Sequence, residues 1–90
     1  MDLANKVALI TGAKRIGASV AEQLAIRGVD IALGYAGSRR EAEEAAVRVE
    51  AAGRRVTLLQ ADLRVPEACR ELVDQAAARL GRVDILIHMA

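Results

Sequence analysis

The fold of this chain is decided by residues 7–17, VALITGAKRIG, where an apolar run leads into a glycine-containing turn and then into a helical pattern. Residues 6–11 have the composition of a buried strand, and residues 16–27 repeat their apolar side chains at helical spacing. A glycine turn lets backbone N–H groups approach a phosphate closely, and the positive end of the following helix points to the same place. The stretch therefore predicts a dinucleotide-binding unit.

The alternation of strand and helix continues along the whole sequence. Strands and helices are expected in turn at residues 6–11, 16–27, 30–35, 38–53, 55–60, 66–81 and 83–88. Strands that are separated by helices run parallel and have right-handed crossovers. The order βαβαβαβ therefore predicts an α/β fold, namely part of a doubly wound, Rossmann-type parallel sheet with strand order 3-2-1-4.

The ends of the helices carry recognisable signals. Ser38 and Glu41 form a capping-box pattern, in which the serine side chain would cap the second helix and the glutamate would reach back to the cap N–H. Gly28 and Gly81 follow the first and third helices, and Gly28 has the usual position of a left-handed cap. Pro66 suits the first position of the third helix.

The helices should bury one face each, and the fourth strand should be covered on both faces because it is almost entirely apolar. Its outer edge would still be open where a further strand pairs, so the architecture suggests an incomplete chain. The residues expected to point inward are Val20, Ala21 and Leu24, then Ala42, Ala45, Ala46 and Val49, then Ala68, Leu72, Val73, Ala76 and Leu80.

Composition narrows the class of protein. The 90 residues are 53% hydrophobic and 28% charged, which indicates one small globular domain. A net charge of +1 is too small to indicate binding to nucleic acid or to an anionic membrane. No signal peptide or membrane span is recognisable, and Cys69 has no second cysteine to pair with, so we expect a cytoplasmic protein. With a single histidine besides, no metal site is expected.

Three segments resemble the short-chain dehydrogenase/reductase family, and the resemblance covers essentially the whole chain. They are residues 11–17 (TGAKRIG), 61–63 (ADL) and 81–87 (GRVDILI). They are similar to NADP-dependent ketoacyl-carrier reductases and pteridine-reductase-like members. The family's turn reads Thr-Gly-x-x-x-Gly-x-Gly, or Thr-Gly-Ala-Ala-Lys-Arg-Ile-Gly in a variant, and this turn is one residue shorter. Either Arg15 replaces the middle glycine after loss of an alanine, or the middle glycine itself is missing.

The resemblance implies which residues hold a dinucleotide. Asp62 and the backbone N–H of Leu63 would bond the adenine ring. The fourth strand ends His88-Met89-Ala90, where the family has Asn-Asn-Ala-Gly, and His88 is expected to bond backbone. The phosphates would lie at the turn, against Gly12, Ile16 and Gly17.

The end of the second strand indicates which dinucleotide. NAD-binding proteins of this fold have an acidic residue there to hold the ribose 2′-hydroxyl, but this chain has Tyr35. Asp30 lies a strand length away and cannot substitute. Ser38, Arg39 and Arg40 follow, with Lys14 and Arg15 across the turn. A hydroxyl and a guanidinium suit a 2′-phosphate, which a carboxylate would repel. We therefore expect NADP, with NAD the less favoured alternative.

No residue of this chain is expected to be catalytic. In the resembling family a tyrosine, a lysine four residues later and a serine act beyond the fourth strand. Here Tyr35 is the only tyrosine and has Arg39 four residues on. Residues 1–90 would then be the cofactor-binding N-terminal part of an enzyme that moves a hydride between NADPH and a carbonyl or similar group. A stand-alone binding module and a decayed, non-binding fragment are the alternatives. The substrate is not readable, and the resemblance implies a dimer or homotetramer for the complete enzyme.

Overall fold

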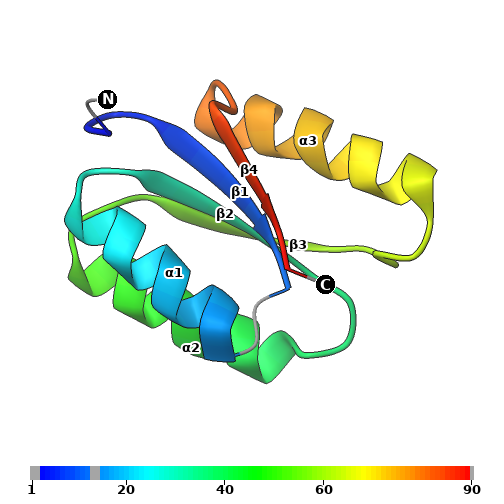
Figure 1. Ribbon diagram of the computed structural model, residues 1–90, viewed down its shortest axis with the longest axis horizontal. Helices are drawn as coiled ribbons and strands as arrows, with labels where there is room; N and C mark the ends of the chain where they lie inside the picture. The colour runs from blue at the N-terminus through cyan, green and yellow to red at the C-terminus, as the bar shows by residue number, and fades with distance from the viewer. Residues whose placement is uncertain (1–2, 13–14, 90) are drawn as a thin grey trace.

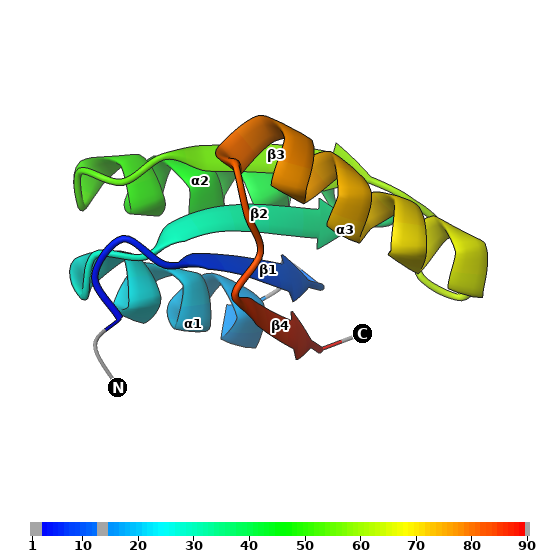
Figure 2. The same ribbon diagram turned by 90° about the horizontal axis from the view of Figure 1, so that it is seen from above.

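A computed structural model describes residues 3–12 and 15–89, apart from the side chain of Arg15. Its elements alternate as expected, and each end lies within two residues of the sequence-based prediction. They are β1 (Val7–Thr11), α1 (Arg15–Ile26), β2 (Asp30–Tyr35), α2 (Arg39–Ala51), β3 (Val56–Gln60), α3 (Pro66–Leu80) and β4 (Ile85–His88). The strands are parallel in the order β3-β2-β1-β4, so the predicted topology is confirmed (Figure 2).

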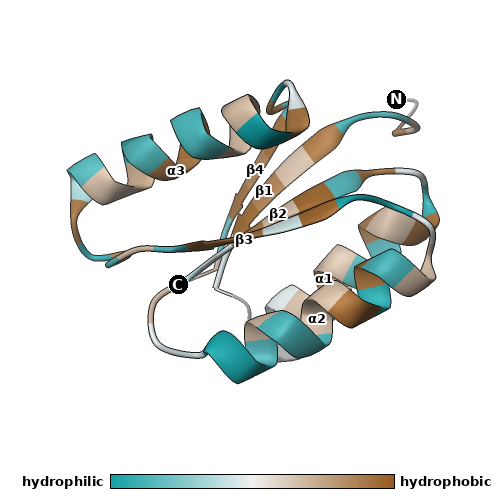
Figure 3. Ribbon diagram, turned by 180° about the vertical axis from the view of Figure 1, so that it is seen from behind, coloured by the Kyte–Doolittle hydropathy of each residue, from teal (hydrophilic) through white to brown (hydrophobic). Residues whose placement is uncertain are grey.

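The sheet separates two layers of helices. α1 and α2 lie side by side on one face, and α3 lies on the other (Figure 1). Side chains of β1 alternate between the two layers, because Ala8 and Ile10 pack toward α1 and α2 while Val7 and Leu9 pack toward α3. Hydrophobic residues accordingly concentrate on the strands, and the hydrophilic ones follow the outer sides of the helices (Figure 3).

The helical faces follow the predicted pattern with one shift. All four residues predicted for α2 are buried, and so are Leu72, Ala76 and Leu80 of α3, whereas Ala68 and Val73 are half-buried. On α1 the fully buried hydrophobic side chains are those of Ala21 and Ala25, while Val20 and Leu24 are half-buried. The alanines face inward because α1 also packs against α2, and this close approach favours small side chains.

The capping predictions are confirmed at the glycines and wrong at Ser38. Gly28 and Gly81 have φ values of 92° and 93°, in the left-handed region. Ser38 is the N-cap residue of α2, but among the described residues its side chain makes no capping hydrogen bond. Its φ of −99° and ψ of 55° depart from the extended backbone that directs a capping hydroxyl toward the helix, which explains the difference.

The two edges of the sheet differ. On β3, the carbonyl of Leu58 accepts a hydrogen bond of 3.3 Å from the Arg79 side chain of α3. On β4, the side chain of Leu86 is 58% exposed, so the prediction of a strand covered on both faces is wrong. The reason is that, in the part of the chain described, α3 contacts β1, β2 and β3 and leaves β4 uncovered on that side.

Two carboxylates fix the amino ends of the strands. Asp84 accepts the N–H of Val7 at 2.9 Å, and this bond together with Arg82 holds the pKa of Asp84 below its usual range. Asp30 is buried and bonds Arg54 at 3.0 Å and Arg55 at 2.8 Å. Burial by itself would raise the pKa of Asp30, but the hydrogen bonds from Arg55 and the charges of both arginines outweigh it, and the pKa is lowered.

At the other end of β1, helix α1 touches the glycine turn directly. A Cβ built on Gly17 would lie 1.9 Å from the carbonyl oxygen of Gly12, so no larger residue fits without moving the backbone. The N–H of Gly12 in turn donates to Gly34 of β2 at 2.8 Å. The glycine pair therefore sets how closely α1 approaches the end of the sheet.

We predict that Gly17→Ala destabilises the protein by about 1–3 kcal/mol through overpacking. This sign is opposite to the usual gain from replacing glycine by alanine inside a helix. Urea unfolding measures the effect, and Gly37→Ala is the control, because no described atom lies within 4 Å of a Cβ at Gly37. Equal stability of the two variants would contradict the contact with Gly12.

A second prediction concerns the buried carboxylate of Asp30. Asp30→Asn should lower the free energy of unfolding at pH 7 by about 1–3 kcal/mol, because it removes charge-assisted bonds to Arg54 and Arg55. Because the pKa of Asp30 is lowered in the folded state, its carboxylate contributes its full stabilisation above the unfolded-state pKa of about 3.9. This contribution is lost as the pH falls through the folded-state pKa. The difference from the wild type should thus shrink in strong acid.

Urea unfolding between about pH 7 and about pH 2 measures this dependence on pH, because the loss begins below the unfolded pKa of about 3.9. Asp74→Asn, at an exposed position on α3, serves as the control and should change stability little. A constant difference between wild type and Asp30→Asn at every pH would show that Asp30 does not act through its charge.

Candidate cofactor site

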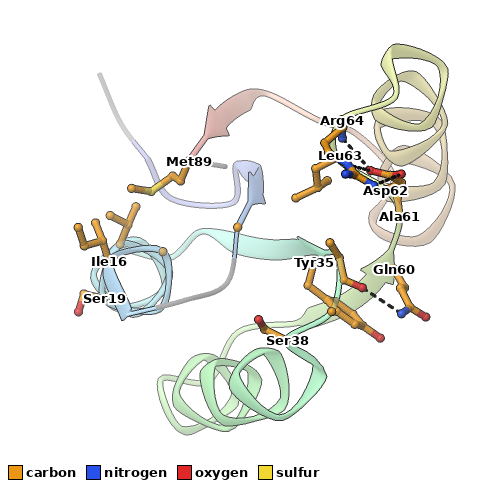
Figure 4. A pocket seen from close by; sticks show the side chains of 15 residues that line it. Ile16, Ser19, Tyr35, Ser38, Gln60, Ala61, Asp62, Leu63, Arg64 and Met89 are labelled. Atoms are coloured by element: carbon orange, nitrogen blue, oxygen red, sulfur yellow. Dashed lines mark hydrogen bonds and ion pairs between the residues drawn. The ribbon is translucent and has the colours of Figure 1, made fainter.

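An open pocket of about 1470 Å³ lies at the carboxyl ends of the strands. Its wall is built from the end of β1, the first turns of α1, the β2–α2 loop, the segment after β3 and the residue after β4 (Figure 4). From β1 the chain runs through α1 and α2 on one face of the sheet and adds β2 and β3 on one side of β1. It then crosses the other face through α3 and adds β4 on the opposite side of β1, so the strand order reverses at β1. Open parallel sheets bind ligands at such a reversal of strand order.

Seven of the ten residues predicted to bind the cofactor line this pocket. They are Gly12, Ile16, Gly17, Tyr35, Ser38, Asp62 and Leu63. Lys14 and the side chain of Arg15 lie outside the described part of the chain, as does Ala90. Arg39 is described and is absent from the described lining.

The glycine turn and the first turn of α1 form one side of the pocket. Gly12 and Gly17 place backbone there without side chains, and Ile16 is 68% exposed at the mouth. Ile16 and Met89 lie on this side, opposite Tyr35 and Asp62 (Figure 4). The arrangement brings backbone and the N-terminal end of a helix toward the pocket, as an anion-binding site requires.

Arg39 lies along α2 and not across the pocket wall. Its Nε is 2.8 Å from the carboxylate of Glu43, and its Nη1 donates to the hydroxyl of Tyr35. The guanidinium carbon is 5.9 Å from the centre of the tyrosine ring. The interaction with Tyr35, its hydrogen bond first, raises the pKa of Arg39, and the charge of Glu43 adds to this. Two partners thus fix a guanidinium whose side chain is still 66% exposed.

The predicted adenine-binding carboxylate is engaged within its own turn. Asp62 accepts the backbone N–H of Arg64 at 3.0 Å, and its two oxygens accept bonds from the Arg64 guanidinium at 3.1 and 3.2 Å. The side-chain bonds, followed by the backbone bond, hold the pKa of Asp62 below its usual range, and Asp62 raises the pKa of Arg64. A ligand that bonds the carboxylate must share it with this arginine.

The end of β4 differs from the prediction in one bond. His88 is bonded through Nδ1 to the hydroxyl of Thr11 at 2.7 Å, and not to backbone as expected. The parallel register pairs these two residues on neighbouring strands, which puts the imidazole beside a buried hydroxyl. The N–H of Met89 then donates to the carbonyl of Thr11 at 2.9 Å, which fixes Met89 at the pocket.

Sequence reasoning missed several lining residues because their side chains are of ordinary types. Their shared signal is position, since most immediately follow a strand or lie on the first turns of α1. Gln60, for example, donates to the carbonyl of Ala36 at 3.0 Å and ties β3 to the β2–α2 loop. The missed residues are Ser19, Val20, Ala36, Gly37, Gln60, Ala61, Arg64 and Met89.

The described residues contain neither a metal-binding cluster nor a membrane-spanning helix. Among residues 3–12 and 15–89, no three acidic, histidine or cysteine residues are grouped so that they could hold a metal ion. Within the same residues, no helix has the length and apolar character needed to cross a membrane.

Comparison with known proteins identifies the family. A family profile described as short chain dehydrogenase matches residues 6–90. The chain belongs to this family. Its curated relatives include the 3-oxoacyl-[acyl-carrier-protein] reductase FabG of Staphylococcus epidermidis, which is 38% identical over 87 residues. Versicolorin reductase stcU of Emericella nidulans is 41% identical over 85 residues.

The matches cover nearly all of this chain and about a third of each relative. The two alignments include 96% and 93% of this chain but 36% of the first relative and 32% of the second. A solved structure described as a putative dehydrogenase from Burkholderia cenocepacia with bound NADP is 40% identical, with a TM-score of 0.91. That match covers 97% of this chain and 34% of the other. These residues therefore share the fold of about a third of that dehydrogenase.

The pairing of Asp62 with Arg64 gives a prediction for the site. Arg64→Ala should raise the pKa of Asp62 toward its ordinary value, because hydrogen bonds to the ionised carboxylate are lost while the backbone bond remains. Carbon-13 NMR titration of the carboxyl group measures the change. The control is Arg70→Ala, at an exposed position on α3, which should leave the titration of Asp62 unaltered.

Proposed function

We propose that residues 1–90 bind NADP and are the cofactor-binding part of a short-chain oxidoreductase. The pocket at the strand ends, with a glycine turn and a helix N-terminus on one side, supports a dinucleotide. The family consists of dehydrogenases and reductases, and a structural neighbour of this chain is described with NADP bound. The cytoplasm is the compartment that we propose for it.

The phosphates would lie at the turn between β1 and α1. Gly12 and Gly17 allow the backbone to approach them, and the dipole of α1 favours negative charge at that end. Lys14 and Arg15 would add positive charge there, and Ile16 would border the same part of the cofactor. Asp62 and the N–H of Leu63 would bond the adenine ring on the opposite side of the pocket.

The choice of NADP rests on the end of β2. No Asp or Glu occurs between Asp30 and Glu41, and Asp30 is bonded to Arg54 and Arg55 at the far end of the strand. Tyr35 and Ser38 line the pocket there, and Arg39 follows with an exposed guanidinium. A 2′-phosphate meets a hydroxyl and a positive charge and no carboxylate that would repel it.

The reaction of the whole enzyme is proposed as hydride transfer between NADPH and a carbonyl or similar group. The nicotinamide supplies the hydride, and residues 1–90 bind and orient it. The proton-donating tyrosine, its lysine and the serine would lie outside these residues, since Tyr35 is the only tyrosine and has Arg39, not a lysine, four residues on. The substrate is a small molecule of undefined identity, and the complete enzyme is proposed to be a dimer or homotetramer.

Isothermal titration calorimetry with NADPH and NADH tests this function. The wild type should bind NADPH more tightly, and Arg39→Ala should weaken NADPH binding by about 1–3 kcal/mol while leaving NADH nearly unchanged. Arg40→Ala is the matched control, because it removes the same charge from the same turn, and Arg40 pairs only with Glu44 in the described structure. Equal losses of both cofactors in Arg39→Ala would overturn the choice of NADP.

A further inference from the structure

Tyr35 joins the hydrophobic core to the surface of α2. It is the last residue of β2, it is 2% exposed, and its ring packs in the core cluster that contains Ala42 and Ala45. A phenylalanine would fill the same space without a polar atom. The hydroxyl of Tyr35 instead meets the Nη1 group of Arg39, so a buried ring ends at a charged and largely exposed partner.

The contacts of Arg39 with Tyr35 and Glu43 leave part of its guanidinium available to a ligand. Nε forms an ion pair with the Glu43 carboxylate, and Nη1 donates a hydrogen bond to the Tyr35 hydroxyl. Nη2 donates no hydrogen bond to a described residue. Its two hydrogens can therefore bind a phosphate oxygen, as an arginine in an anion site does. The guanidinium is therefore held in place and can still receive an anion.

Of the two partners that hold this guanidinium, Tyr35 is the one that lines the pocket. Tyr35 lines the pocket, as does Ser38, the residue before Arg39, whereas Glu43 lies one helical turn further along α2. The guanidinium carbon of Arg39 lies 5.9 Å from the centre of the Tyr35 ring, on the side of the hydroxyl. The neighbouring Arg40 has an equivalent partner in Glu44 but no aromatic support, and its side chain is 93% exposed.

We propose that Tyr35 is a positioning residue that selects the phosphorylated cofactor through Arg39. Its hydroxyl holds the guanidinium at the rim of the pocket, so that less side-chain freedom is lost when a 2′-phosphate binds. NADH lacks this phosphate and gains nothing from the arrangement. The inference rests on the proposed function, because it requires Arg39 to bind the 2′-phosphate.

A double-mutant cycle on the whole chain tests the inference. Dissociation constants for NADPH and NADH are measured for the wild type, Tyr35→Phe, Arg39→Ala and the double variant. Tyr35→Phe should raise the dissociation constant of NADPH about threefold to tenfold, the range for one hydrogen bond, and change that of NADH less than about twofold. In the Arg39→Ala background, Tyr35→Phe should have no further effect on NADPH.

The outcomes separate this inference from the proposed function. If Tyr35→Phe weakens both cofactors equally, leaves NADPH unaffected, or acts undiminished in the Arg39→Ala background, the positioning role is wrong and the role of Arg39 stands. If Arg39→Ala itself does not affect NADPH, the phosphate contact is wrong, and the inference falls with it. A wild type that binds neither cofactor overturns the dinucleotide site as a whole.

A second measurement avoids any loss of folding in Tyr35→Phe. Tyr35 is the only tyrosine, so growth on 3-fluorotyrosine places a single fluorine label at this position. The fluorine NMR signal should shift more on saturation with NADPH than with NADH, and Arg39→Ala should abolish that difference. Identical shifts with the two cofactors in the wild type would overturn the inference.

Discussion

The structure depends on the burial of β1 on both faces. All five of its residues are buried, because β2 and β4 pair with its two edges while helices cover its faces. A strand in this position must be apolar, and every backbone group must find a partner. The Asp84 carboxylate accepts the N–H of the first residue of β1, and the carbonyl of the last residue accepts the N–H of Met89. The N–H of Gly12, just after the strand, donates to the carbonyl of Gly34. The glycine turn can then emerge only at the carboxyl end, where the pocket opens.

Charge is distributed unequally between the two ends of the sheet. At the amino ends of the strands, Asp30 and Asp84 are engaged by arginines and a backbone N–H, which stabilise their ionised forms. At the carboxyl ends, Asp62 is the acidic residue of the described pocket wall, and Arg64 occupies its oxygens. An anionic ligand at the pocket therefore meets little uncompensated negative charge, and carboxylates that stabilise the fold lie far from it.

The strand order and all seven elements could be predicted from sequence, because the apolar patterns and the glycines report local and topological constraints directly. The inward residues of α2 could be predicted for the same reason. The orientation of Arg39 could not, since it depends on a tyrosine hydroxyl from the core and on Glu43 one turn away. Sequence spacing suggests a cap at Ser38, but the backbone angles decide whether its hydroxyl can reach the helix. The bond between His88 and Thr11 likewise depends on register between strands far apart in sequence.

The two edge strands make growth of the sheet directional. A strand that approaches β3 must displace the Arg79 guanidinium from the carbonyl of Leu58, and it meets a charged side chain as it does so. A strand that approaches β4 meets the exposed apolar surface of Leu86 and displaces no such group among the described residues. Unpaired strand edges attract further strands unless charge or cover protects them. A further strand can therefore pair with the edge of β4, whereas Arg79 protects the edge of β3 against pairing.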